Sequence, residues 1–281
     1  MKHFKLTSET KINALGIKVF RIECIIDSKW AKVGDKGGWI ENEKNLFDNA
    51  WVSDNACVCG NARVSDNARV SDNACVSGNA CVSGNARVSG NAWVSDNTHV
   101  SGNAYVGGNA CVGGNACVSG NARVSDDACV RGGARVFGYA CISGNTWVSD
   151  NACISGNAWV CDSASVIGNT EVSDSVRVNG NACVGGDACV SGNAWVSGNA
   201  CVGGNAWICG NADYCCFQYF GSANRTTTAF KQKDGSVAIK CGCFFGSLYD
   251  FAKQVEKTHG DNKYGKQYKA IIEVIKAKFE L

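Results

Sequence analysis

An aliphatic residue recurs at every sixth position from Val52 to Ile208, and no insertion or deletion interrupts the pattern. The twenty-seven hexapeptides are variants of Ala-x-Val-Ser-(Gly/Asp)-Asn. Because side chains alternate along a strand, Ala and Val point to one side and x points to the other. A fixed period with one small and one large apolar position predicts a parallel β-solenoid, in which three hexapeptides make one coil.

The polar half of each hexapeptide, Ser-(Gly/Asp)-Asn, has to turn the chain at a corner. Its middle residue is Gly or Asp at all twenty-eight corners from Asp48 to Gly210, and the next residue is Asn at twenty-two of them. Since Asn tolerates the left-handed backbone region, we expect the Asn position to lie near that region. Such short corners leave no room for crossover helices, so the pattern predicts a three-sided prism.

The segment before the repeat is predicted to be a small β-rich cap. It opens with the polar run KLTSETK, and IKVFRIECII then alternates as a strand does. Ile40 and Leu46 already lie on the six-residue grid, so the first coil begins before the repeat is obvious. Gly34, Gly37 and Gly38 are expected to form the turn that leads into this coil.

After Ala212 the grid stops, and a composition richer in Lys, Phe and Tyr begins. DYCCFQYF, RTTTAFKQ and SVAIKCGCFF are predicted strands, the last two joined by a hairpin at Lys233-Asp234-Gly235. Ser247 is placed to cap a helix that runs to about Lys257 and ends at His259-Gly260.

A second helix is capped by Asp261 or Asn262 and carries one apolar stripe, which we expect to be core. The stripe consists of Tyr264, Tyr268, Ile271, Ile272, Ile275 and Phe279. The chain is therefore predicted to be mostly β, with an N-terminal β cap over residues 1–39, a hexapeptide-repeat β-helix over residues 40–212 and an α+β module over residues 213–281.

Several segments resemble a known family. They are FKLTSETK, VFRIECI, VGDKGGWIENEKNL, the tandem GNARV and DNARV hexapeptides, and the C-terminal GCFFGSLYDFAKQVEKTHGDNKYGKQYKAIIEVIK. They resemble hexapeptide-repeat proteins common in phages and prophages, which are similar to a bacterial left-handed β-helix protein labelled an acyltransferase. The resemblance covers nearly the whole chain and implies a left-handed solenoid, but it assigns no biochemical role.

Composition adds limits on location and charge. The chain has 281 residues and a net charge of +2, and no stretch approaches a membrane span. The opening MKHFKLTSET lacks the apolar run of a signal peptide, so we expect a protein of the bacterial host cytoplasm whose nineteen cysteines are free thiols. The repeat is mildly acidic and contains no Lys, and this charge alone does not indicate a nucleic-acid-binding protein.

Reading the outward residue of every third hexapeptide reconstructs three flat faces. The first face is Trp51, Arg69, Arg87, Tyr105, Arg123, Cys141, Trp159, Arg177 and Trp195. The second face is Cys57, Cys75, Trp93, Cys111, Cys129, Trp147, Ser165, Cys183 and Cys201. The third face is Arg63, Cys81, His99, Cys117, Arg135, Cys153, Glu171, Cys189 and Trp207.

The first face places guanidinium groups beside aromatic rings. One interpretation is a ladder of cation–π contacts that stabilises the solenoid itself. The other is a platform for an anionic or aromatic partner, formed by Trp51, Arg69, Arg87, Tyr105, Arg123, Trp159, Arg177 and Trp195.

The second face is apolar and carries no charged outward residue, which suggests self-association or a protein partner. Its predicted contact residues are Cys57, Cys75, Trp93, Cys111, Cys129, Trp147, Cys183 and Cys201. Drift toward apolar residues within a tolerant repeat explains the same pattern. No Cys or His spacing typical of a zinc site occurs, so neither a metal nor another cofactor is predicted.

The sequence is consistent with three functions. The first is a non-enzymatic scaffold that self-associates and presents its faces to a host protein or another host macromolecule, including one of host defence. The second is an acyltransferase that uses acetyl-CoA. Against it, the repeat has no loop insertion to hold a substrate, and the whole chain has only three histidines, His3, His99 and His259. The third is a nucleic-acid-binding solenoid. No membrane partner is expected.

Overall fold

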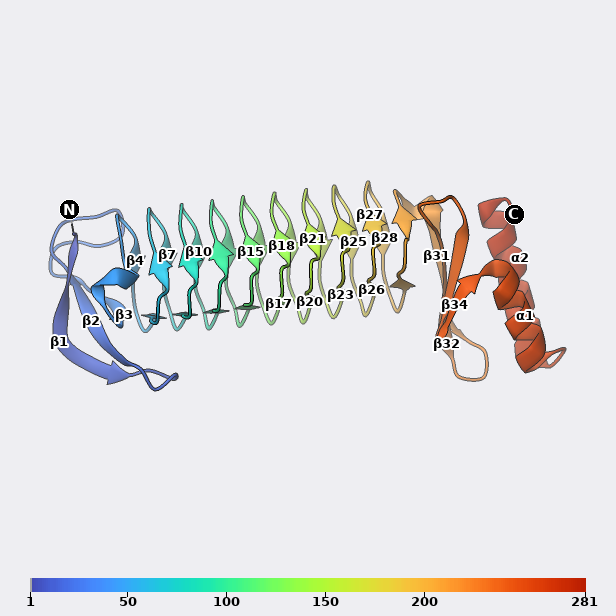
Figure 1. Cartoon of the computed structure of the whole chain (residues 1–281), viewed down its shortest axis with the longest axis horizontal. Helices are drawn as coiled ribbons and strands as arrows, with labels where there is room; N and C mark the ends of the chain where they lie inside the picture. The colour runs from blue at the N-terminus through green and yellow to red at the C-terminus, as the bar shows by residue number, and fades with distance from the viewer. Residues whose placement is uncertain (1) are drawn as a thin grey trace. The chain divides into compact units, whose positions relative to one another are not determined.

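The computed structural model describes residues 2–281 and divides the chain into two compact units. The first unit ends at Gly156 and the second begins at Asn157. Both units contain coils of a parallel β-solenoid, and the chain is mostly β (Figure 1). The predicted fold class is confirmed. The domain boundaries at 39/40 and 212/213 and the handedness of the coils remain predictions.

Three parallel sheets form the coils of the first unit, and each face of the sequence analysis belongs to one sheet. The first face carries β4 (Trp51–Val52), β7 (Arg69–Val70), β10 (Arg87–Val88), β13 (Tyr105–Val106), β16 (Arg123–Val124) and β19 (Cys141–Ile142). The second carries β5 (Cys57–Val58), β8 (Cys75–Val76), β11 (Trp93–Val94), β14 (Cys111–Val112), β17 (Cys129–Val130) and β20 (Trp147–Val148). The third carries β6 (Arg63–Val64), β9 (Cys81–Val82), β12 (His99–Val100), β15 (Cys117–Val118), β18 (Arg135–Val136) and β21 (Cys153–Ile154).

The register is the one that the period predicts. Arg87 pairs with Arg69 on one side and with Tyr105 on the other, each one coil away. The inward Ala and Val side chains are buried throughout, while Thr98, Thr146 and Thr170 replace Ala inside the coils. The hydroxyl of Thr98 donates to the carbonyl of Ser95 at 2.6 Å, so this buried polar group keeps a partner.

The corners differ from the expectation. The left-handed backbone lies at the Gly or Asp of every corner from Asp48 to Gly204, and not at the Asn that follows it. The prediction for Asn was wrong because the Asn side chain bonds to the neighbouring coil instead. Asn79 donates to Asn97 at 3.0 Å, and Asn97 donates to Asn115 at 3.0 Å. Stacked corner amides thus form a ladder that links successive coils.

Corner Asp residues adopt the left-handed backbone at some cost in strain, which a hydrogen bond offsets. In Asp66, with φ of 58°, Oδ2 accepts the backbone N–H of Gly84, one coil further on, at 2.8 Å. Asp72 accepts the N–H of Gly90 in the same way at 2.9 Å. The carboxylates of these corners therefore accept hydrogen bonds that link successive coils.

An antiparallel sheet covers the start of the first unit: β1 (Phe4–Ile12), β2 (Lys18–Cys24) and β3 (Lys36–Ile40), followed by a 3-10 turn, η1 (Glu43–Asn45). The polar run KLTSETK, which has no strand-like alternation, lies in strand β1 and gains its order from pairing with β2. Ile40 pairs with Val58 in parallel register, as its place on the six-residue grid predicts.

Gly37 and Gly38 lie in strand β3 and not in a turn, which corrects the expectation for both; Gly34, with φ of 93°, does turn the chain. A Cβ atom on Gly38 would lie 2.7 Å from the carbonyl oxygen of Ala56. On Gly37 it would lie 2.6 Å from the carbonyl oxygen of Val52. These glycines allow the cap strand to approach the coil backbone closely.

The second unit begins with nine short strands. Its first-face strands are β22 (Trp159–Val160), β25 (Arg177–Val178) and β28 (Trp195–Val196). The second face carries β23 (Ser165–Val166), β26 (Cys183–Val184) and β29 (Cys201–Val202), and the third carries β24 (Glu171–Val172), β27 (Cys189–Val190) and β30 (Trp207–Ile208).

A short turn, η2 (Asn211–Asp213), leads into an antiparallel sheet of β31 (Tyr214–Phe220), β32 (Arg225–Lys231), β33 (Val237–Cys241) and β34 (Phe244–Ser247). The segment expected as one strand, SVAIKCGCFF, is two strands, because Gly242 with φ of 56° turns the chain between them. The hairpin at Lys233-Asp234-Gly235 is confirmed.

Two helices pack on this sheet: α1 (Leu248–His259) and α2 (Lys263–Phe279). Ser247 caps α1 through the N–H of Asp250, and Asn262 caps α2, as predicted. Tyr268, Ile271, Ile272 and Ile275 of the apolar stripe are buried in one core with Ile239. None of the helices in residues 2–281 combines the length and apolarity of a membrane span.

Candidate binding surface

The first face of the first unit contains a shallow hollow of about 630 Å³ around Tyr105. Arg87 and Arg123 flank it, and corner residues Asn85, Asn103 and Asn121 edge it. The strand pairing fixes this order, because β10, β13 and β16 are consecutive in one sheet. The outward neighbours that the sequence predicted are thus side by side.

The Tyr105 ring is held in place by its surroundings. Its hydroxyl accepts a hydrogen bond from Ser89 at 3.1 Å, and the guanidinium of Arg123 lies 5.3 Å from the ring centre. Residue 107 is Gly where most hexapeptides have Ser, and a Cβ atom there would lie 2.2 Å from the Tyr105 hydroxyl oxygen. This departure from the repeat makes room for the ring.

Neither Arg87 nor Arg123 forms an ion pair with a carboxylate within residues 2–281. The corner acids Asp72 and Asp126 accept hydrogen bonds from the backbone N–H groups of Gly90 and Gly144. Arg87 and Arg123 are both exposed. The hollow therefore has two uncompensated positive charges on either side of an aromatic ring, which suits an anionic or aromatic ligand.

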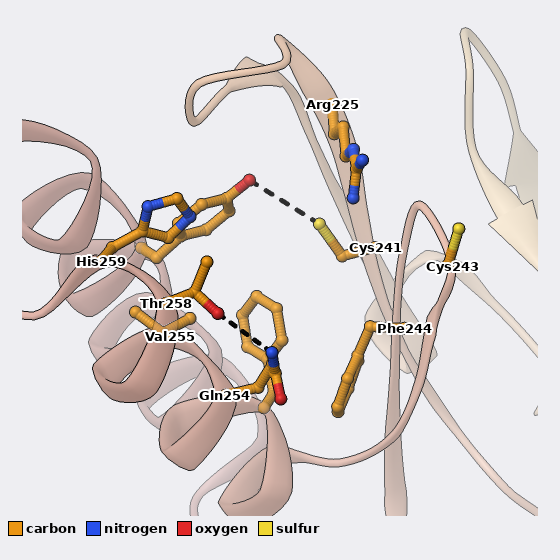
Figure 2. Close-up of a pocket in the computed structure, with 10 residues that line it drawn as sticks. Arg225, Cys241, Cys243, Phe244, Gln254, Val255, Thr258 and His259 are labelled. Atoms are coloured by element: carbon orange, nitrogen blue, oxygen red, sulfur yellow. Dashed lines mark hydrogen bonds between the residues drawn. The ribbon is translucent and has the colours of Figure 1, made fainter.

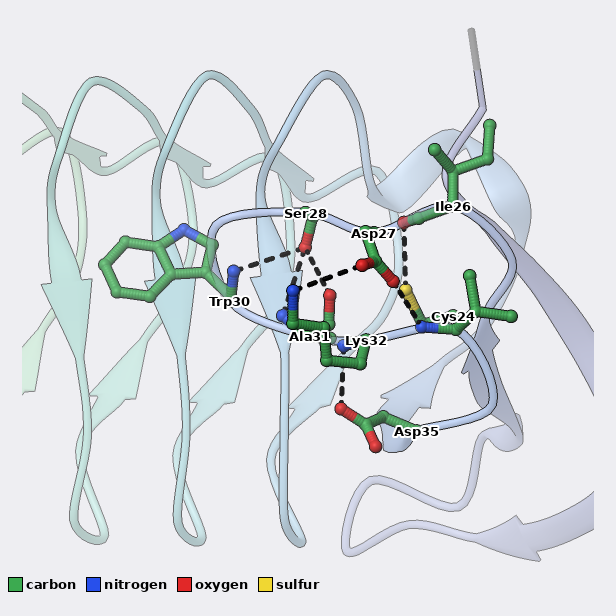
Figure 3. Close-up of polar contacts among 9 residues, drawn as sticks. Cys24, Ile26, Asp27, Ser28, Trp30, Ala31, Lys32 and Asp35 are labelled. Atoms are coloured by element: carbon green, nitrogen blue, oxygen red, sulfur yellow. Dashed lines mark hydrogen bonds and ion pairs between the residues drawn. The ribbon is translucent and has the colours of Figure 1, made fainter.

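A loop of the N-terminal cap reaches this face, which the sequence did not predict. Figure 3 shows this loop, which carries Trp30. The Trp30 ring lies 5.8 Å from the guanidinium of Arg69 and 5.7 Å from that of Arg87. The loop is rigidified by its own hydrogen bonds: the Ser28 hydroxyl accepts from the backbone of Trp30, and Asp27 accepts from Val33. In the sequence, the only sign of this contact was Trp30 itself, a single aromatic residue among charged ones.

Two of the residues predicted to contact a partner are not freely exposed. Trp51 is 3% exposed, because His3 of the cap packs against its ring at 5.9 Å. Arg69 is half-buried beneath Trp30. The cap thus covers the beginning of the first face and leaves Arg87, Tyr105 and Arg123 as its accessible part in this unit.

In the second unit the first face is a stack of exposed side chains. The guanidinium of Arg177 lies 5.8 Å from the Trp159 ring and 6.0 Å from the Trp195 ring. Trp195 also donates its indole N–H to Asn179 at 2.8 Å. Trp159 and Trp195 remain 46% and 48% exposed, so this ladder is self-supporting and also presents aromatic surface.

The second face is less uniform than its outward residues suggested. Cys57 is 7% exposed, because the cap covers it and Asn13 donates to its sulfur at 3.4 Å. Arg131 reaches over the face from a corner: it donates to the Cys111 sulfur at 3.3 Å and lies 5.9 Å from the Trp147 ring. The expectation of a face without charge was therefore wrong in this unit.

The cysteines of this face are free thiols. In the second unit, the hydrogen bond that Cys183 donates to Cys201 raises the pKa of Cys183 and lowers that of Cys201 to about 6. The hydrogen bond to Cys111 raises the pKa of Arg131 further. Within residues 2–281, no cluster of His, Cys, Asp or Glu is arranged to hold a metal ion.

Self-association through the second face remains a prediction. We expect Trp93→Glu combined with Trp147→Glu to convert an oligomer into a monomer, because two carboxylates would be desolvated in the interface. Sedimentation at micromolar concentration measures this change, and Trp207→Glu on the third face is the matched control. An unmutated protein that sediments as a monomer would contradict the prediction.

Two of the three histidines have local roles in the first unit. His3 Nε2 lies 2.9 Å from the carbonyl oxygen of Ala50, and burial lowers the pKa of its ring. His99 is exposed on the third face, where its Nδ1 lies 3.1 Å from the carbonyl oxygen of Asn97. In neither case does a carboxylate orient the ring among the hydrogen bonds of the described residues.

The coils and their outward residues define a class: a β-solenoid protein of hexapeptide repeats. Within that class, the repeat matches the family model described as YdcK beta solenoid repeat over residues 56–71, 62–78 and 80–96. Among solved structures, the chain is similar to UDP-N-acetylglucosamine acyltransferase from Campylobacter jejuni. The two share 17% identity with a TM-score of 0.47, over 61% of this chain and 71% of the other. No curated protein sequence matches the chain.

Proposed function

We propose that the protein is a non-catalytic β-solenoid scaffold that binds an anionic macromolecule through the accessible part of its first face. The observation that carries the proposal is the hollow around Tyr105, where Arg87 and Arg123 have no carboxylate partner among the described residues. Two guanidinium groups without a carboxylate partner favour the binding of an external anion, because the anion reduces the repulsion between them.

Two features support binding over catalysis. Interior and corner residues are nearly constant along the repeat, whereas the outward residues vary, so sequence differences are concentrated where a partner would touch. The contacts of His3 and His99 are to backbone carbonyls, which does not prepare either ring as a general base for acyl transfer. An acyltransferase that uses acetyl-CoA is the weaker alternative.

The resemblance to phage and prophage proteins makes a protein of the bacterial host cytoplasm, including a component of host defence, the first candidate for the partner. Nucleic acid is the second candidate, favoured by the position of Tyr105 between two arginines, where a base could stack while phosphates pair. Self-association would present several copies of the face together and raise its avidity.

The proposal is tested by partner capture from host lysate with the unmutated protein and with Arg87→Gln/Arg123→Gln. We expect the double variant to lose the partner and the unmutated protein to release it as salt rises, because ionic contacts are screened. If the partner is nucleic acid, capture ends after nuclease treatment, and the double variant reduces the salt slope by about 2.

The control is Arg63→Gln/Arg135→Gln, which removes two exposed arginines from the third face. It should retain the partner. A partner held equally by both double variants would contradict a role for the first face. Heat on calorimetric titration with acetyl-CoA would instead support the enzyme.

A further inference from the structure

A second hollow, of about 350 Å³, lies within the second unit between α1 and the sheet. Figure 2 shows Arg225, Cys241 and Phe244 of the sheet facing Gln254, Val255 and Thr258 of α1. This volume is at the lower end of the range of ligand pockets, about 300–1,000 Å³. None of the residues that line it belongs to the first face.

Aromatic and apolar side chains form the floor of this pocket. Phe251, Val255 and Tyr268 belong to the buried core. The Phe244 ring lies 5.2 Å from that of Phe251, tilted by 51°, and Phe251 meets Tyr268 edge-on at 5.7 Å. His259 stacks on Tyr268 at 5.6 Å. Such walls favour a flat or branched apolar body.

The polar group on the floor is neutral. Burial raises the pKa of the Tyr268 hydroxyl to about 12, so the phenol keeps its proton at neutral pH. Its oxygen lies 3.8 Å from the Cys241 sulfur, which accepts a further hydrogen bond from Thr227 at 3.3 Å. The floor therefore offers weak donors and no negative charge.

The rim carries one permanent charge, Arg225. No Asp or Glu lines the hollow, and Arg225 takes part in none of the ion pairs of residues 2–281. A Cβ atom on Gly242 would lie 2.8 Å from Arg225 Nη1, so the hairpin turn leaves space for the guanidinium beside the pocket. A single guanidinium matches a monovalent carboxylate in bidentate fashion, whereas a phosphate dianion would be left half neutralised.

We propose that this pocket binds a small organic acid, with the carboxylate on Arg225 and an aromatic or branched body against Phe244, Phe251 and Val255. The walls supply apolar contact, Arg225 supplies orientation and charge, and Gln254 and Thr258 complete the polar edge of the pocket. The volume suits a free acid of about ten heavy atoms.

The test uses phenylacetate with the full chain, followed by saturation-transfer NMR and by calorimetry. We expect saturable binding that phenylacetamide, its neutral analogue, does not displace. Arg225→Gln should weaken binding at least about tenfold, because it removes a charge-assisted hydrogen bond. Gln254→Glu should weaken it similarly, since it places a carboxylate of the same shape in the lining.

Both substitutions are at exposed positions, so thermal unfolding should be unchanged and loss of binding can be read directly. Arg135→Gln, on the third face of the first unit, is the control and should bind phenylacetate as the unmutated protein does. Absence of binding to the unmutated protein at millimolar phenylacetate, or equal binding by Arg225→Gln, would overturn the proposal.

Discussion

Val118→Asp is expected to unfold the coils around it, with a loss of at least about 3–5 kcal/mol in the free energy of unfolding. Val118 is fully buried, and its strand neighbours are Val100 and Val136, which offer no hydrogen bond to a carboxylate. Denaturant unfolding followed by circular dichroism measures the loss.

Burial would raise the pKa of the introduced carboxyl group above its value in the unfolded chain. Below the unfolded-state pKa, about 4, both states are protonated, and the charge-dependent part of the loss should disappear; it should grow as the pH rises above this value. Cys117→Asp, one residue earlier, is the control. Its side chain faces outward beside Arg135, so its stability should be nearly unchanged. Equal unfolding of the two variants would mean that the inside and outside positions are wrongly assigned.

Gly38→Ala is expected to destabilise the first unit by about 1–3 kcal/mol or more. The added methyl group would lie 2.7 Å from the Ala56 carbonyl oxygen and 2.7 Å from Val52 Cγ1. The same carbonyl accepts the N–H of Trp39 at 2.9 Å, so relief of the clash would lengthen a hydrogen bond between the cap and the coil.

Gly203→Ala is the matched control, because its nearest atom would be a carbonyl oxygen 4.0 Å away and most hexapeptides have a larger residue at this position. Thermal unfolding should place this variant at or slightly above the unmutated protein, since alanine restricts the unfolded chain. A Gly38→Ala protein that melts with the control would show that strand β3 is not held against the coil.

The sequence by itself determined the repeating part of the fold. The inward Ala and Val, the outward variable residues and the parallel pairing of Ile40 with Val58 all follow from a six-residue period that makes one side chain per hexapeptide face solvent. Helix α1 was equally predictable, because Ser247 acts through the N–H of Asp250, three residues away. These features depend on local geometry or on strict periodicity, both of which a single sequence contains.

Tertiary structure decided what the repeat does not encode. It placed Trp30 over Arg69 and Arg87, and extended Arg131 across the second face. The first contact joins a loop of the cap to the repeat, and the second comes from an Arg that stands where most hexapeptides have Ser. The geometry of both depends on loop path or side-chain reach. The loop at Trp30 limits the accessible part of the first face. The pocket at Arg225 is bounded by a sheet and a helix whose residues lie far apart in the chain, so the sequence alone did not predict it.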